Sequence, residues 1–191
     1  TVSREEEESE ESFLERVRAT LPERIDSLIV GMGSKKVSAR LLDFPFGDIR
    51  KVEAAVDFEL ESQVPYNLEN IASTWVITDR TKSSAEVLAA VAPRNFVEES
   101  LFELKKCRLE PRAMVFPAAA LGELVPQGSK GCVGVLSVGA SESHLSIVSD
   151  GNLSFVRSLR VGGASVDRAI AGAQGIDLEA ARKLKEQGHL D

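Results

Sequence analysis

The chain has 191 residues, of which 43% are hydrophobic and 28% charged, which suits a globular protein with one large or two small domains. A formal net charge of −7 argues against a nucleic-acid partner, because such binders neutralise phosphates with clustered lysine and arginine. Two cysteines without CxxC spacing argue against a disulfide framework or a structural zinc site, and they fit a reducing compartment.

The chain offers no targeting or membrane signal of its own. No run approaches the roughly 18 to 20 apolar residues that cross a bilayer, and the acidic start lacks the apolar stretch of a signal peptide. We expect a soluble piece of a longer protein, since the sequence lacks an initial methionine and stops directly after a predicted helix. The acids of residues 5–11, interrupted by Ser9, are expected to be solvated, and they suit the first turn of a following helix.

Helices and strands follow one another irregularly along the rest of the chain. Apolar spacing of three to four residues marks the helices, and alternation or short apolar runs mark the strands. Asp48 and Asp177 are candidate N-caps, Pro65 should end the helix before it, and Gly175 and Gly188 are candidate helix ends. The predicted elements are a helix at 13–21, strands at 27–32 and 37–42, a helix at 49–63, strands at 71–78 and 85–91, a helix from 93 to about 104, a strand at 112–116, a helix at 118–124, three strands between 132 and 163, and two helices capped by Ser165 and Asp177.

This order predicts a mixed α/β or α+β fold and not a regular βαβ repeat. The middle portion runs strand-helix-strand-strand-helix-strand. It should form a compact subdomain with one sheet covered by two helices. No internal sequence repeat is present.

The most informative motif lies between Cys132 and Gly163. Three short strands are joined first by the polar loop of residues 139–143 and then by Asp150-Gly151, a pair that tolerates positive φ in a two-residue turn. The backbone N–H groups of Gly139, Ala140 and Ser141 in the first loop could bind a phosphate. This pattern indicates a phosphate-loop scaffold or the relic of one.

Two segments resemble bacterial PilM and GspL proteins. Residues 40–69, which begin Arg-Leu-Leu-Asp-Phe-Pro-Phe-Gly-Asp-Ile-Arg-Lys, resemble a stretch of that family with an acidic helix followed by a proline. The later Ser-Val-Gly-Ala-Ser from Ser137 and Arg-Val-Gly-Gly to Gly163 resemble its second phosphate loop and the following hairpin. The resemblance extends over nearly the whole chain and implies a partial actin-like ATPase fold with ribonuclease H-like lobes.

The resemblance also implies a division of the chain. Residues 1–35 would begin the first lobe, 36–112 would be the inserted small subdomain, 113–128 would return to the first lobe, and 129–191 would start the second lobe.

Within the family, the Leu-Asp-Phe-Pro-Phe-x-Asp-x-Arg-Lys and Phe-Glu-Leu-Glu patterns favour GspL. By resemblance, the protein would be a non-catalytic scaffold on the cytoplasmic face of the bacterial inner membrane. It would recruit a secretion ATPase of the GspE type and contact other inner-membrane platform proteins. It would reach the membrane only through a segment outside this chain, and a homodimer is left open. The alternative is a PilM-type pilus assembly protein that binds ATP as a switch in its full-length form.

Enzyme activity is not expected. In actin-like ATPases the second phosphate loop begins with an aspartate that helps to hold magnesium, and here that position is Ser137, whose hydroxyl carries no formal charge. The first phosphate loop would precede Thr1 and the adenosine motif would follow Asp191. Gly139, Ala140 and Ser141 are therefore interpreted as a vestigial phosphate loop, with no catalytic residue, cofactor or metal.

Other candidate residues have simpler interpretations. Ser143 and His144 should point to opposite faces of a strand and lack a partner acid, which argues against a hydrolase. The acids of the 49–63 helix form either a solvated face or a docking surface, and Trp75 lies either in the core or at an interface. These acids are Glu53, Asp57, Glu59 and Glu61; Cys107 and Cys132 are expected in the core or at an edge, and His189 at the surface.

Overall fold

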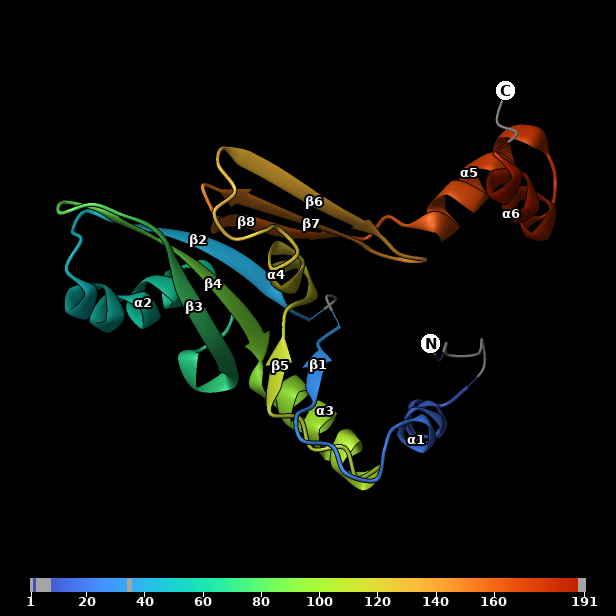
Figure 1. Cartoon of the computed structure of the whole chain (residues 1–191), viewed down its shortest axis with the longest axis horizontal. Coiled ribbons are helices and arrows are strands. Elements are labelled where there is room, and N and C mark those ends of the chain that lie inside the picture. Colours follow the sequence, from blue (N-terminus) through green and yellow to red (C-terminus); the bar gives the residue numbers. More distant parts are fainter. Residues whose placement is uncertain (1, 3–7, 34–35, 189–191) are drawn as a thin grey trace. The chain divides into compact units, whose positions relative to one another are not determined.

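The structure is a computed structural model that describes residues 2, 8–33 and 36–188 (Figure 1). Part of the acidic run, residues 5–7, and His189 lie outside the described residues. No described helix has the length and apolar character needed to span a membrane. The elements are α1 (Glu10–Thr20), β1 (Ile29–Gly31), β2 (Ser38–Phe44), α2 (Ile49–Gln63), the short 3-10 helix η1 (Leu68–Asn70), β3 (Ile71–Arg80), β4 (Ala85–Pro93), α3 (Arg94–Lys106), β5 (Ala113–Val115), α4 (Pro117–Gly122), β6 (Cys132–Val138), β7 (Ser143–Ser149), β8 (Asn152–Leu159), α5 (Gly163–Gln174) and α6 (Leu178–Gln187).

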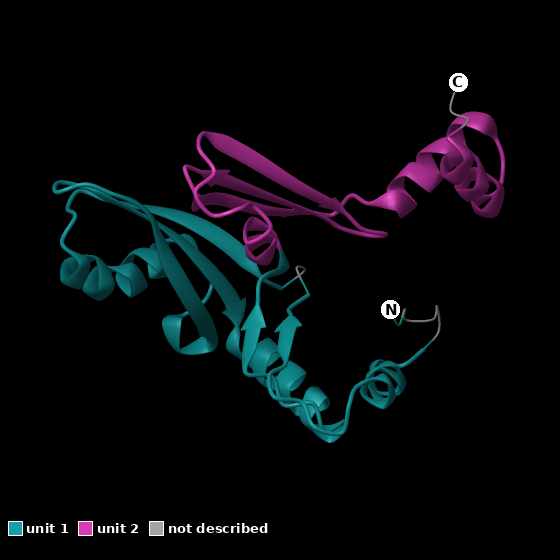
Figure 2. Cartoon of the chain, viewed as in Figure 1, with its two compact units in different colours: residues 1–117 teal, residues 118–191 magenta. Residues whose placement is uncertain are grey.

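The chain divides into two compact units, residues 1–117 and 118–191 (Figure 2). The two units are defined by their compactness alone. They do not test the lobe boundaries that the family resemblance implies, which stay predictions.

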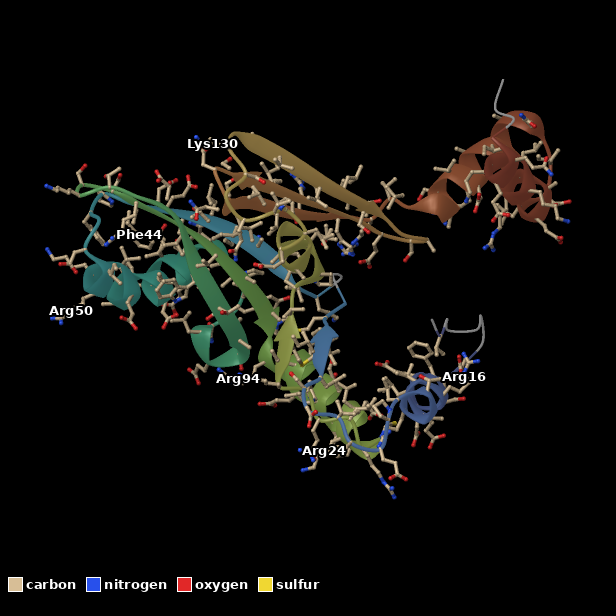
Figure 3. The ribbon with its side chains drawn as sticks, viewed as in Figure 1. Arg16, Arg24, Phe44, Arg50, Arg94 and Lys130 are labelled. Carbon is tan, nitrogen blue, oxygen red and sulfur yellow. The ribbon has the colours of Figure 1, made fainter. Side chains whose placement is uncertain are left out.

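The main core of the first unit lies between a three-stranded sheet and α2. The strands are antiparallel in the order β2-β4-β3. Val52, Val56 and Leu60 recur at helical spacing along α2 and are fully buried, which is why this helix packs against the sheet. Phe44, labelled in Figure 3, and Leu42 meet them from β2.

A second, smaller apolar cluster of the first unit lies between α1, β1 and the end of α3. Leu104 and Cys107 at the end of α3 and the following Leu109 are buried, and apolar residues of α1 and β1 pack against them. β1 and β5 form a two-stranded parallel sheet. The prediction that all four strands of the middle portion share one sheet was therefore wrong, because the strand after α3 pairs with β1 and the main sheet has three strands.

The second unit contains the antiparallel sheet β6-β7-β8. The buried Ser146 of β7 donates from its Oγ to the Ala118 carbonyl of α4, so this helix lies against one face of the sheet. The other face carries apolar side chains, with Leu136 60% and Val138 63% exposed. The hairpin turn has positive φ at Asp150 and Gly151, as predicted.

Most predicted helix ends are confirmed by their caps. Asp48 and Asp177 accept backbone N–H groups at the starts of α2 and α6, and Gly175 and Gly188 end α5 and α6 in the left-handed conformation. The prediction that Ser165 caps α5 was wrong, because the helix already begins at Gly163. The first amides of α5, those of Gly163 and Ala164, donate to the carbonyls of Gly139 and Ala140, so they need no side-chain cap.

Candidate functional site

The loop between β6 and β7, called the glycine loop here, holds the three residues predicted to bind phosphate. Gly139, Ala140 and Ser141 follow directly after β6 and are exposed. The Gly139 N–H donates to the Glu142 carbonyl at 2.9 Å and closes a tight turn. Among the described residues, the amides of Ala140 and Ser141 have no acceptor, so they are the donors that this loop could offer to an anion.

The carbonyl side of the glycine loop is bound to the start of α5. The amides of Gly163 and Ala164 donate to the carbonyls of Gly139 and Ala140 at 2.9 and 2.8 Å. The approach is so close that a Cβ on Gly162 would lie 2.6 Å from the Gly139 oxygen. A helix start normally offers such amides to anions, and here they are used within the protein.

Lys185 of α6 lies beside the same helix start, where an acid holds it. Its Nζ is 2.6 Å from Asp167 Oδ1, and it donates to the Gly163 carbonyl at 3.3 Å. The Asp167 side chain is only 14% exposed and that of Lys185 26%. Because the carboxylate neutralises the ammonium, the pair adds no net positive charge beside the glycine loop.

Ser137 is part of a row of polar residues that crosses the end of the sheet. It lies opposite His144 of β7, which lies opposite Ser158 of β8. His144 Nδ1 and Ser158 Oγ are 2.9 Å apart. The row contains no carboxylate, the ligand that Mg²⁺ prefers, and no group of three His, Cys, Asp or Glu residues suited to a metal occurs in the described part of the chain.

Ser143 and His144 do not form a nucleophile–base pair. Ser143 is buried, and its Oγ donates to the Val161 carbonyl at 2.6 Å. His144 is engaged by Ser158 instead. The alternation of side chains along β7 therefore separates the two residues, as predicted.

The remaining candidates lie in different places. Glu53, Asp57 and Glu61 are exposed on α2, so both a solvated face and a docking surface stay open. Trp75 is half-buried and packs against the main core of the first unit. The fourth acid of α2, Glu59, is half-buried. Of the two cysteines, Cys107 is buried and Cys132 is exposed.

A cavity of about 350 Å³ opens in the first unit between α1, the end of β1, α3 and β5. Apart from Glu10 and Ser100, its lining residues have no polar side chain, and the Ser100 hydroxyl is already bonded to the Phe96 carbonyl. An apolar cavity of this size suits side chains of a bound partner or ligand. Its lining residues are Glu10, Phe13, Leu14, Val30, Gly31, Met32, Gly33, Phe96, Ser100, Leu104 and Met114.

No local pattern in the sequence predicts this cavity, because its walls come from four separate segments of the chain. Phe13 and Phe96 lie on the apolar faces of two separate helices, α1 and α3. Only the fold shows that these apolar faces border the same space.

Comparison with known families identifies the chain. The family model described as type IV pilus assembly protein PilM matches residues 3–191. The chain belongs to the PilM family. This membership confirms the resemblance to PilM and GspL proteins.

Two solved structures show the same fold. One is the PilM-PilN type IV pilus biogenesis complex, with 22% identity and a TM-score of 0.72 over 92% of this chain and 56% of that chain. The other is the cytoplasmic domain of EpsL, an inner-membrane component of the type II secretion system of Vibrio cholerae. It has 14% identity and a TM-score of 0.56 over 87% of this chain and 63% of that chain.

These comparisons confirm the mixed α/β, actin-like ATPase fold that the sequence predicts. The chain spans little more than half of the PilM chain that it matches. The family model is described as a type IV pilus assembly protein, whereas the likeness to the EpsL domain, at 14% identity, is a likeness of fold.

Proposed function

We propose that this PilM-family chain is part of a non-catalytic scaffold at the cytoplasmic face of the bacterial inner membrane. The scaffold holds a membrane-anchored partner of the pilus machine and couples it to the other assembly proteins. The observation that carries the proposal is the apolar cavity between α1 and α3, which is open to a partner and contains no pair of groups suited to catalysis. The PilM-PilN complex supports a partner of the PilN type.

Filling the cavity tests this function. Ser100→Phe places a ring into the cavity, and we expect it to weaken binding of PilN, purified in detergent from the same bacterium, by about tenfold or more. Ser62→Phe is the matched control, because Ser62 is also a helix serine bonded to a preceding carbonyl, but it is exposed on α2 and does not line the cavity. Equal affinities of the two variants in biolayer interferometry would exclude the cavity as the partner site.

The same proposal treats the glycine loop as a relic without nucleotide turnover. Ser137 supplies no charge for magnesium, and the carbonyls of Gly139 and Ala140 are bonded to the start of α5. We expect the full-length protein to show no saturable ATP binding in calorimetry with magnesium present. Micromolar binding would favour the alternative, a PilM-type switch, and Ser137→Asp would then be expected to strengthen that binding.

A GspL-type platform protein is the second candidate. The Leu-Asp-Phe-Pro-Phe and Phe-Glu-Leu-Glu patterns support it, as does the EpsL fold. Such a protein would recruit a secretion ATPase of the GspE type. If alkaline carbonate fails to strip the full-length native protein from membranes, an integral platform protein is favoured; if carbonate releases it, a peripheral pilus component is favoured.

A further inference from the structure

The main sheet of the first unit has an apolar row on the face opposite α2. α2 lies on one face of the sheet (Figure 1), where it packs against Val87 and Ala89 of β4. Because side chains alternate along a strand, the intervening Leu88 lies on the other face. There it is flanked by Leu41 of β2 and Val76 of β3, and these three residues are called the apolar row. Leu41 and Val76 are 40% and 49% exposed, so both ends of the row are accessible.

Three acids, called the acid row, lie next to the apolar row on the same face. Asp43 of β2 and Asp79 of β3 both lie opposite Glu86 of β4. Asp43 and Asp79 are exposed, and none of the three carboxylates takes part in an ion pair within the described ranges of the chain. The nearest base along β3, Arg80, is directed to the other face, where its guanidinium is 3.5 Å from the Gly47 carbonyl. The negative charge of the acid row is therefore not neutralised by an ion pair.

The acid row destabilises the free sheet, because like charges directly opposite each other on neighbouring strands repel. A β-bulge brings one of the acids into the row. The register of β3 shifts between Ile77 and Asp79, so that Asp79 lies opposite Glu86. In a regular strand Thr78 would take that place and Asp79 would face α2. Bulges re-aim side chains and occur often beside functional sites, and a partner that supplies positive charge would relieve the repulsion here.

The two rows together define the chemistry of the partner. The apolar row crosses three strands, or about 10 Å, and the acid row lies two residues further along the strands, or about 7 Å away. A helix is about 10 Å wide and rises about 10 Å over seven residues, so apolar side chains at i, i+3 or i+4, and i+7 match the apolar row. Lysine or arginine on the adjacent side of that helix would reach the acids. A second copy of this chain, with a net charge of −7, would add acids and not bases.

We propose that this face of the main sheet is a docking surface for a basic amphipathic helix of a partner protein. Binding covers the exposed ends of the apolar row and places cations against the acid row. The proposal goes beyond the scaffold function and does not depend on the apolar cavity, because none of these residues lines it.

A designed peptide tests the surface on the whole chain. The probe is a labelled helix of about 18 residues, with leucines at helical spacing on one face and lysines beside them. The control peptide has the same composition in an order without that spacing. In fluorescence anisotropy we expect the probe to bind with a micromolar dissociation constant, and the control peptide to bind about tenfold or more weakly than the probe. Absence of saturable probe binding, or equal binding of both peptides, would overturn the proposal.

Matched charge variants locate the binding. The double variant Asp43→Asn, Asp79→Asn removes two exposed acids of the acid row, and we expect it to raise the dissociation constant of the probe by about tenfold or more. The double variant Glu53→Gln, Glu61→Gln removes two exposed acids of α2 and should change it less than about twofold. Equal weakening by both double variants would show attraction to the net charge alone and would overturn the proposal.

The melting temperature gives a readout that needs no peptide. Because the Asp43→Asn, Asp79→Asn variant removes the repulsion across the sheet, we expect its melting temperature in scanning calorimetry to exceed that of the parent chain by about 1–4 °C. A lower melting temperature would mean that these acids stabilise the free sheet. The acid row would then need no partner, and the proposal would fail.

Discussion

At the scale of single residues, Gly162 shows how space constrains the glycine loop. Its φ of −155° is ordinary extended backbone, so any residue could adopt it. The constraint is steric, because a Cβ here would lie 2.6 and 2.7 Å from the carbonyl oxygens of Gly139 and Ala140. Those oxygens are fixed by their bonds to the start of α5 and cannot withdraw without breaking them.

Gly162→Ala is therefore expected to destabilise the second unit. The overlap should lower the free energy of unfolding by about 1–3 kcal/mol, measured by urea denaturation and followed by hydrogen exchange in β7. Gly172→Ala is the control, because no atom other than the backbone of its own helix lies within 4 Å of its Cβ position, and alanine favours the interior of α5. A Gly162→Ala variant as stable as the Gly172→Ala variant would mean that the loop and α5 separate easily.

The two cysteines should differ in reactivity with pH. Burial, and then the negative charges of Glu15, Glu11 and Glu103, raise the pKa of the Cys107 thiol above its ordinary value of 9.0. At pH 8 we expect iodoacetamide to modify the exposed Cys132 and to leave Cys107 intact, as read by mass spectrometry. Cys132→Ala should remove the modification, and rapid labelling of Cys107 in that variant would contradict its burial.

The same pKa direction fixes a dependence of stability on pH. The folded state holds the Cys107 proton more tightly than the unfolded chain does. The contribution of the Cys107 thiol to the free energy of unfolding is fully present below its ordinary pKa of 9.0 and is lost as the pH rises through the folded-state pKa. Between pH 8 and pH 10 the free energy of unfolding, measured by urea denaturation, should therefore fall less for the Cys107→Ser variant than for the parent chain.

At the scale of elements, local signals predicted most of the fold. Asp48 and Pro65 bracket α2, and apolar residues at helical spacing between them, Val52, Val56 and Leu60, form its buried face. These signals operate within one or two helical turns, so a single sequence reveals them. The hairpin turn at Asp150 was predicted for the same reason.

Features that depend on distant segments were not predicted. The start of α5 is fixed by carbonyls of the glycine loop more than twenty residues earlier, and no local pattern at Ser165 records this. The pairing of β5 with β1, which helps to form the apolar cavity, joins segments about 80 residues apart. Hence the candidate loop residues could be named from the sequence, whereas the cavity could not.

The cap of α2 gives a prediction at this scale. Asp48 accepts the amides of Arg50 and Lys51 at 3.0 and 3.2 Å, and Asp48→Ala should lower the free energy of unfolding by about 1 kcal/mol. Asp48→Asn keeps an acceptor and should retain most of the stability. Thermal unfolding of the three proteins measures the difference, and equal losses for both variants would point to the charge and not the hydrogen bonds.

At the scale of the whole molecule, the two units differ in how they are held together. The first has a continuous core between α2 and the main sheet, whereas the sheet of the second is covered by α4 on one face and carries exposed apolar side chains on the other. We expect the first unit to have the higher local stability, because burial of apolar surface drives folding.

Leu60→Ala tests whether the units are independent. Leu60 is fully buried in the first core, so its truncation should cost about 2–5 kcal/mol there. In hydrogen exchange, amides of β4 should lose protection while those of β7 keep theirs. Loss of protection in both strands to the same extent would show that the chain unfolds as one cooperative body.

The placement of aromatic residues gives the two units unequal optical signals. Trp75 and Tyr66 are the only tryptophan and tyrosine of the chain, and both belong to the first unit. Intrinsic fluorescence and absorbance near 280 nm therefore record the core beside α2 and contain no tryptophan or tyrosine signal from residues 118–191. A native emission spectrum is accordingly compatible with an unfolded glycine loop, and a tryptophan introduced into β8 at Phe155 would give that half of the chain a signal of its own.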